Sequence, residues 1–433
     1  MRINMNKRNF LTILLLVAAL AITSVLYANG PNFNRGRAQY VHKNYDKAKE
    51  HFLKGLAVGE RGDTYFFLGE IEKIQGNFTE AEKYYTLALT VKTTPKYLSN
   101  AYWNLVLIAE QRGDTQALAR ICKTMWKRNN DNSAKEKIDQ LINKLVWTDN
   151  QAAITKYNQA LSAKSTDPAK SIQLLTEAME LAGDFIAAQF EKAMLLSASN
   201  QTDEAKTLFE DITTKIPIYA SAHIAFANLL YDEGDYETSI THYNKALEFG
   251  FLSRDTEFLI LSKLSQSYLA MENFTDAINT SIQASRLRPS DIPTLLFQSS
   301  IYIRQRDLDS AMKTLTSAEK IDSKNPDVTL QIGSIHFRNK DPKYIQSFDK
   351  LADLIIANPR IGCRKYSQAL NLLMKAHFDA EKYTRIRAIA PHIKDCLSDE
   401  IISMLTKLEQ EDNSNKKEDN KDNKDNKSEQ TTQ

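Results

Sequence analysis

The chain has 433 residues, and its 56 lysines and arginines against 54 aspartates and glutamates give a formal net charge of +2. A balance this close to neutral excludes the strong global field that would favour nucleic acid or an acidic substrate, so nucleic acid is not an expected partner. Hydrophobic residues make up 42% of the chain, enough to bury a core, and only 13 glycines and 10 prolines agree with an all-α protein.

The N-terminal segment, residues 1–28, is patterned as an export signal. Arg2, Lys7 and Arg8 precede an apolar run from Phe10 to Leu26, and the small residue Ala28 follows, which is typical of a secretory signal peptide. The run is also near the lower length limit of a membrane-spanning helix, so an uncleaved anchor and a buried helix are the competing interpretations. We expect an exported, periplasmic protein, either soluble or tethered to the inner membrane by residues 10–28.

The stretch from Ile218 to Phe249 predicts two amphipathic helices joined by a tight turn. In the first part, apolar residues such as Phe226 and Leu230 recur at three- and four-residue steps, which places them on one helical face. Gly234 then interrupts the pattern, because glycine accepts the left-handed conformation that ends a helix. The second part rebuilds an apolar face, so the stretch predicts a helical hairpin that cannot bury its apolar surface alone.

The same hairpin pattern recurs along most of the chain. A residue in the first turn of the predicted second helices, usually a small one, marks the repeat. The markers form two runs, within which the steps are 33, 34 or 38: Ala48 and Ala81 near the N-terminus, and then Ser171, Ala205, Ser239, Ala277, Ala311 and Ile345. A helix–turn–helix texture with a period of about 34 residues resembles the tetratricopeptide repeat. The resemblance is carried by residues 76–81 with Tyr85 and Ala88, by residues 234–236 with Tyr243 and Ala246, and by Asn273 and Phe274 with Ala277 and Ala284.

The resemblance implies an all-α solenoid, in which stacked helix-turn-helix hairpins form a right-handed superhelix. We predict an N-terminal array of about three units over residues 29–128 and a C-terminal array of about seven over residues 151–396. A polar stretch at residues 129–150 breaks the phase of the repeats and is predicted to be a joint. Residues 397–410 are predicted to form a capping helix, and residues 411–433, rich in Lys, Asp, Glu and Asn, a disordered low-complexity tail.

Catalytic patterns are absent from the sequence. It contains no HExxH, GxxxxGK or GxSxG pattern, and none of its seven histidines follows another at a step of three or four, the spacing that places two ligands on one helical face. We therefore predict no catalytic residue, metal site or cofactor. A basic group on one predicted helix, Arg120, Lys123, Lys127 and Arg128 with Trp126, could contact phosphate but is more typical of a solvated face.

Two of the three cysteines are placed to meet. Cys363 begins the first helix of the last predicted hairpin and Cys396 follows its second helix, so antiparallel packing would bring them together. A disulfide could form there in an oxidising compartment, while two free thiols are the alternative. We expect Cys122 to be a small apolar residue between helices.

The resemblance also implies where partners bind. In the family, the first helix of each unit lines an extended concave groove for peptides or proteins, and first-helix residues off the packing face become its candidates. They are Phe190, Met194, Asn228, Tyr231, Gln266, Ser300, Arg304, Ser334 and Arg338. An ordinary helix surface is the competing interpretation for each of them.

Three functions follow from these features. The first is a non-catalytic scaffold of the bacterial cell envelope that binds a protein or peptide partner, with membrane association if the N-terminal segment is uncleaved. The second is a ligand-binding component that encloses a small apolar molecule beside a transporter. The third is an enzyme, which would need a compact cluster of titratable residues within one pocket.

Overall fold

A computed structural model of the chain describes residues 30–59, 62–129 and 131–411. The predicted export signal at residues 1–28, and the predicted tail after residue 411, lie outside the described residues. Within them the chain forms α-helices and short 3₁₀ segments and no β-strand. No helix in these ranges is long and apolar enough to cross a membrane.

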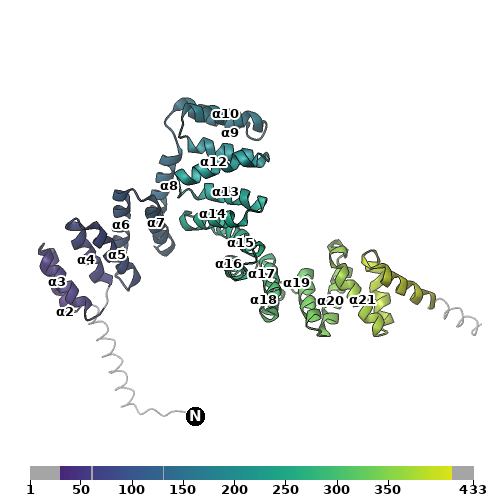
Figure 1. Cartoon of the computed structure of the whole chain (residues 1–433). Coiled ribbons are helices and arrows are strands. Elements are labelled where there is room, and N and C mark those ends of the chain that lie inside the picture. Colours follow the sequence, from purple (N-terminus) through teal and green to yellow (C-terminus); the bar gives the residue numbers. More distant parts are fainter. Residues whose placement is uncertain (1–29, 60–61, 130, 412–433) are drawn as a thin grey trace, which may run out of the picture. The chain divides into compact units, whose positions relative to one another are not determined.

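The described helices divide into two compact units that meet in the sequence at Leu252 and Ser253. Helices of the first unit pair as hairpins on either side of a single helix, α8 (Figure 1). They are α2 Pro31–Val41, α3 Tyr45–Leu56, α4 Gly62–Ile74, α5 Phe78–Thr90, α6 Pro95–Arg112, α7 Thr115–Asn129, α8 Asn132–Val146, α9 Gln151–Ala163, α10 Pro168–Leu181, α11 Ile186–Ala198, α12 Thr202–Lys215, α13 Ala220–Glu233 and α14 Tyr236–Phe249.

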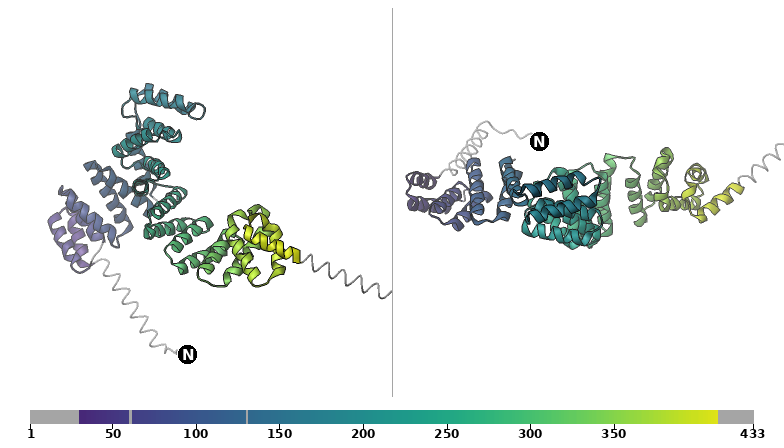
Figure 2. Two further views of the ribbon diagram at one scale, coloured as in Figure 1. Left: turned by 45° about the vertical axis from the view of Figure 1, so that its right-hand side comes forward. Right: turned by 90° about the horizontal axis from the view of Figure 1, so that it is seen from above.

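The second unit consists of four hairpins and a last helix at residues 399–411. Its elements are α15 Arg254–Ala270, α16 Phe274–Leu287, α17 Ile292–Arg304, α18 Leu308–Ile321, α19 Pro326–Arg338, α20 Lys343–Ala357, η2 Pro359–Ile361, η3 Arg364–Tyr366, α21 Ser367–Asp379, α22 Tyr383–Ile393 and η4 Lys394–Cys396. The two views in Figure 2 show hairpin following hairpin within each unit. The predicted all-α solenoid of helical hairpins is confirmed.

Small residues let the helices approach closely, as the marker positions predict. Seven of the eight markers are at most 1% exposed, whereas Ile345 is half-buried. The prediction for Ile345 is wrong by one residue. In the α4–α5 hairpin the ring of Tyr85, on the second helix, lies against Gly69 of the first helix. In the α19–α20 hairpin Phe348 and Gly333 take these two places, and they are one residue closer in the sequence. One residue fewer between the two helices shifts the register of α20.

The predicted joint at residues 129–150 contains α8, whose apolar face packs into the core of the first unit through Ala134, Ile138 and Val146. The division of the chain into two arrays at this joint stays a prediction. Residues 399–411 cover the end of the second unit with Ile401, Leu405 and Leu408, all buried in its core.

Candidate partner-binding surface

Most hairpins are filled by one large residue of the second helix. A small residue on the first helix faces it: a Cβ added to Gly36 would lie 2.8 Å from the Phe52 ring, and one added to Gly69 would lie 2.7 Å from the Tyr85 ring. The same two positions hold Ala193 and Phe209, Ala227 and Tyr243, and Ser299 and Leu315, all of them buried. We call the second-helix position the plug.

The α15–α16 hairpin departs from this rule, because its plug is Ser281. Ser265 lies at the small position, and Ser281 at the plug position is 1% exposed. Its Oγ is buried and has no hydrogen-bond partner among the described residues. A serine is much smaller than a phenylalanine, tyrosine or leucine, and Ser265 at the small position is small as well, so the space that those larger residues fill stays open here as a pocket of about 320 Å³.

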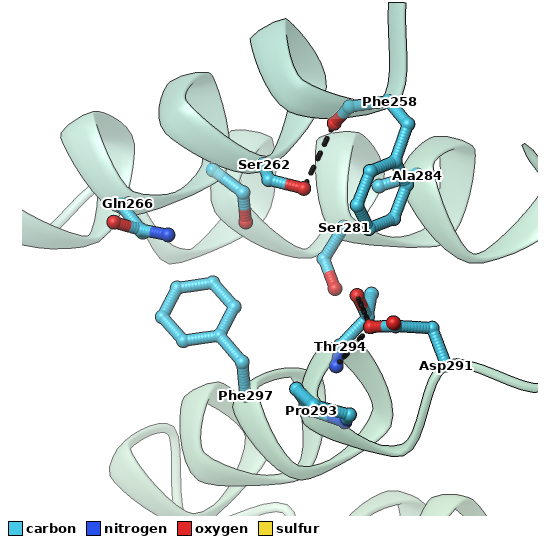
Figure 3. A pocket seen from close by; sticks show the side chains of 10 residues that line it. Phe258, Ser262, Gln266, Ser281, Ala284, Asp291, Pro293, Thr294 and Phe297 are labelled. Carbon is cyan, nitrogen blue, oxygen red and sulfur yellow. Dashed lines mark hydrogen bonds between the residues drawn. The ribbon is translucent and has the colours of Figure 1, made fainter. Parts of the chain in front are cut away.

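This pocket, named here the serine pocket, lies between α15, α16 and the start of α17 (Figure 3). Its lining includes Phe258, Ser262, Ser265, Ser281, Asp291 and Phe297. Figure 3 shows the Ser281 hydroxyl pointing into it, with the ring of Phe297 on one side and that of Phe258 on the other. Asp291 caps α17 by accepting a hydrogen bond from the Thr294 backbone N–H at 2.9 Å.

A second pocket of about 320 Å³, the arginine pocket, lies between α19, α20 and α21; its lining includes Leu330, Ser334, Arg338, Phe348, Lys365 and Tyr366. Lys365 pairs with Asp327 at 2.6 Å, and its Nζ lies 5.6 Å from the centre of the Tyr366 ring. The Tyr366 hydroxyl donates to Asp327 at 3.0 Å. Burial, and then this carboxylate, raise the pKa of Tyr366 to about 12, so the phenol stays protonated. Arg338 is exposed and has no ion-pair partner among the described residues.

A family model described as tetratricopeptide repeat matches residues 62–94 and 220–249. The chain contains tetratricopeptide repeats.

The chain is similar to known proteins both in sequence and in structure. Over 125 residues it is 26% identical to the mitochondrial import receptor subunit TOM70 of Saccharomyces cerevisiae, covering 28% of this chain and 20% of that protein. The chain thus spans about a fifth of the length of this curated relative. Among solved structures it is similar to YrrB, described as a TPR protein with an unusual peptide-binding site, with a TM-score of 0.36 and 19% identity over 42% of this chain and 91% of that one. It is also similar to pilF of Pseudomonas aeruginosa, with a TM-score of 0.37 and 14% identity over 49% of this chain and 92% of that one.

The repeats of the second unit bring some of the predicted groove residues to its pockets. Gln266 lines the serine pocket, and Ser334 and Arg338 line the arginine pocket. Arg304 is exposed at the end of α17. Ser300 is half-buried and its hydroxyl donates to the Phe297 carbonyl at 2.6 Å.

The candidates of the first unit are engaged more by the fold itself. Phe190 packs against the rings of Phe209 and Tyr219, with centroids 6.1 and 5.5 Å away. The exposed Asn228 accepts a hydrogen bond from the Tyr243 hydroxyl at 2.6 Å. The half-buried Tyr231 meets the Tyr236 ring edge-on, and Met194 is 39% exposed. A role in binding stays a prediction for all nine residues.

The basic group on α7 is used largely by the fold. Arg120 pairs with Glu248 at 2.5 Å, Lys123 is 7% exposed and donates to the Leu247 carbonyl, and Trp126 packs edge-on against Phe251 at 5.4 Å. The expectation of a solvated face is wrong for Lys123, which is buried against the end of α14, and holds for Arg120, which is exposed even though it pairs with Glu248.

Two features escaped the sequence analysis. Ser281 is visible as the polar plug once the repeats are aligned by their markers. His223 and His242 lie outside the spacing of one helix, and they meet across the α13–α14 hairpin with their Nδ1 atoms 2.8 Å apart. The signal for that pair would have been two histidines on the facing surfaces of one hairpin.

The cysteines of the last repeat are joined. Cys363 and Cys396 form a disulfide with their Cα atoms 5.8 Å apart, which ties the start of η3 to η4 across the last hairpin. Cys122 is a free, buried thiol at the plug position of α7, and burial raises its pKa to about 12. A thiol that stays protonated in this way is a poor nucleophile.

Proposed function

We propose that the chain is a non-catalytic scaffold that binds a peptide or protein partner along the first helices of its repeats. The observation that carries the proposal is the pair Arg304 and Arg338. They end the consecutive first helices α17 and α19, stand one repeat apart, and are both exposed. Neither has an ion-pair partner within the described ranges, so no carboxylate of the described residues competes with a ligand for their guanidinium groups.

The physical case for binding rests on rigidity. Side chains on packed helices lose little conformational entropy when a ligand docks, and each arginine offers several donors in a fixed geometry to a carboxylate or a peptide carbonyl. The serine and arginine pockets add space for partner side chains on the same unit. Both are open and carry polar groups, which supports peptide binding over the enclosure of a small apolar molecule.

Site-specific photocrosslinking in the native cell tests this function. A benzoylphenylalanine at position 304 or 338 should capture one discrete partner. The same group at the exposed Thr316, on the second helix α18, serves as the control. Capture at position 316 as efficient as at 304 and 338, or at none of the three, would contradict the proposal.

We further infer that the scaffold works outside the cytoplasm, in the cell envelope. The charged and apolar pattern of residues 1–28 and the Cys363–Cys396 disulfide support this location, because disulfides persist in oxidising compartments. Mass spectrometry of the native protein would give the mature N-terminus, which separates cleavage after Ala28 from a retained anchor. Alkylation of intact cells should leave Cys363 and Cys396 unlabelled; two labelled thiols would argue for a reducing compartment.

A further inference from the structure

We propose that the serine pocket binds a basic side chain, arginine or lysine, of the partner. The inference rests on the proposed function only in that the side chain belongs to a bound peptide. The hydrogen-bonding capacity, charge and shape of the pocket support the site itself.

Three of the four hydroxyl groups that line the pocket offer acceptors rather than donors, because the fold already uses their protons, whereas Ser281 has no partner for its proton or its lone pairs among the described residues. A hydroxyl has one proton to donate. The Ser262 proton goes to the Phe258 carbonyl at 2.8 Å and the Ser265 proton to the Ala277 carbonyl at 2.6 Å. The Thr294 hydroxyl donates to Asp291 Oδ2 at 2.5 Å. Their lone pairs remain, so a ligand rich in N–H donors fits this lining.

Asp291 supplies the charge. Its Oδ2 accepts from both the backbone and the side chain of Thr294, whereas its Oδ1 has no hydrogen-bond partner in the part of the chain that the structure describes. An ionised carboxylate with one oxygen uncommitted is a strong acceptor for a guanidinium or an ammonium group.

An anion is disfavoured at the same place, although a helix begins there. The N-terminus of a helix attracts anions through its free N–H groups. In α17, Pro293 has no N–H, the Thr294 N–H is capped by Asp291, and the Leu295 N–H bonds to the Asp291 carbonyl at 3.2 Å. The donors that would hold an anion are therefore largely used, and the Asp291 charge would repel it.

The shape of the pocket suits the long stem of a basic side chain. A volume of about 320 Å³ is at the lower end of the roughly 300–1,000 Å³ of ligand pockets, enough for one side chain rather than a large ligand. The rings of Phe258 and Phe297 provide apolar contact for the methylene groups, and the Phe297 ring offers an aromatic face for the cation. The chain already uses this chemistry, since the Arg288 guanidinium lies over the Phe258 ring at 4.1 Å and pairs with Asp255 at 2.6 Å.

Ser281 gives the independent sign of a ligand. A buried hydroxyl without a partner costs free energy, and other hairpins avoid that cost with an apolar or aromatic plug. A donor from a bound side chain would satisfy Ser281 Oγ, which points into the pocket (Figure 3).

The test uses the full chain and blocked amino acids as probes: N-acetyl-arginine methylamide, its citrulline analogue, and N-acetyl-norleucine methylamide. Citrulline keeps the size of arginine but is neutral, and norleucine keeps only the stem. Binding is followed by saturation-transfer NMR at low ionic strength, where charge pairs are least screened. We expect the arginine probe to bind and citrulline to bind roughly tenfold more weakly, as a charge-assisted hydrogen bond becomes a neutral one.

Three variants place the binding in the serine pocket. Ser281→Leu restores a plug that α17–α18 already uses, where Ser299 faces Leu315, and should abolish binding while the melting temperature is kept or raised. Asp291→Asn keeps a helix cap but removes the charge, and should weaken the arginine probe to the citrulline level. Asp307→Asn is the matched control, because Asp307 caps α18 by the same contact, from the Ser310 N–H at 3.0 Å, outside the pocket.

Equal binding of arginine and citrulline, unchanged binding in Asp291→Asn, or full binding in Ser281→Leu would overturn the inference. Ser281→Ala is the alternative variant if Ser281→Leu does not fold. It leaves the pocket open and removes only the hydroxyl, so unchanged binding of the arginine probe would count against the proposed role of that hydroxyl. The two proposals fail separately. If the arginine probe binds but no partner is captured at positions 304 and 338, the basic-side-chain site stands and the scaffold function is refuted. If a partner is captured but the arginine probe does not bind, the scaffold function stands and the site is refuted.

Discussion

Ala205 illustrates at the residue scale how the repeats pack. It lies in the first turn of α12 with none of its surface exposed, next to the core residues Phe209 and Ile212 of the same helix. A methyl group is the largest side chain that such a close helix crossing accepts without a shift of the neighbours. Equivalent residues meet the first helix of their own hairpin, as Ser171 meets Ala160 and Ala277 meets Ser265, so the side-chain volume at this position determines how closely α11 and α12 approach each other.

Ala205→Arg should be strongly destabilising. The longer side chain overpacks the crossing and buries a charge without a partner, which costs on the order of 1–3 kcal/mol or more. Ala388→Arg, the same substitution at an exposed position of α22, should leave the melting temperature within about a degree or two. Equal melting temperatures of the two variants would mean that Ala205 is not at a close crossing.

A second residue-scale feature is the left-handed residue that ends the first helix of most hairpins. Gly234 has φ 86° and Gly76 φ 80°, and in other hairpins the same turn position is filled by residues with a Cβ, such as Arg306 at φ 63° and Glu272 at φ 58°. Only glycine adopts this conformation without a steric cost. The chain thus carries this cost in several repeats and avoids it in others.

Replacing glycine at one of these turns, and introducing glycine at another, should change the stability of the protein in opposite directions. Gly234→Ala places a Cβ where no atom lies within 4 Å, so its cost comes from the backbone alone and should be about 1 kcal/mol. Arg306→Gly should stabilise, by less than that, because glycine also gains freedom in the unfolded chain. Thermal melting of both variants checks the pair; stabilisation by Gly234→Ala would show that the turn does not hold the left-handed conformation.

At the scale of an element, the α13–α14 hairpin is held by a pair of neutral histidines. His223 Nε2 lies 2.9 Å from the Pro217 carbonyl, which can only accept, so this nitrogen carries the proton. His223 Nδ1 must then accept, and His242 Nδ1 donates to it at 2.8 Å. A second proton on His223 would set two N–H groups against each other.

This arrangement makes the hairpin sensitive to acid. Burial lowers the pKa of His223. Burial is also the larger cause, and the charge of the neighbouring His223 the smaller one, that lower the pKa of His242 to about 4. In the unfolded chain both groups titrate near a pKa of about 6.5. Their contribution to stability is therefore complete above pH about 6.5 and is lost as the pH falls towards 4, on the order of 1–3 kcal/mol in total.

His242→Gln should reduce this pH dependence, because glutamine can still donate to His223 Nδ1 but does not titrate. The thermal midpoint, followed by tryptophan fluorescence from pH 7 to pH 4, should fall less in the variant than in the natural chain. His392→Gln, at an exposed histidine of α22, is the control and should keep the natural profile. Parallel profiles for all three proteins would refute a role of the pair.

Elements and their neighbours were largely predictable from the sequence, because small residues and turn residues act locally. Gly234 ends its helix as expected, and Ser239 and Ala277 are buried as expected. Contacts beyond the next repeat were not predictable: Arg120 of α7 and Glu248 of α14 meet across a sequence separation of 128, a distance that the repeat period does not relate. Of the candidate site, Ser334 and Arg338 follow from the repeat period, whereas the serine pocket depends on a missing plug that periodicity alone does not reveal.

At the scale of the whole molecule, stability in a solenoid is a sum of local terms, because each repeat contacts mainly its neighbours. A change that destabilises one unit should therefore leave the unfolding transition of the other unit unchanged. The chain offers such a readout: its three tryptophans, Trp103, Trp126 and Trp147, all lie in the first unit, whereas the Cys363–Cys396 disulfide lies in the second.

Reduction of the disulfide should destabilise the second unit alone. The bridge joins positions separated by 33 in the sequence, and closing a loop of this length restricts the unfolded chain by about 3–4 kcal/mol. With a reductant, or in Cys363→Ser/Cys396→Ser, part of the helical signal in circular dichroism should melt at a lower temperature while the tryptophan fluorescence transition stays in place. A fluorescence transition that moves with the helical signal would show instead that the two units unfold as one cooperative body, and the local account of stability would then have to be given up for the whole chain.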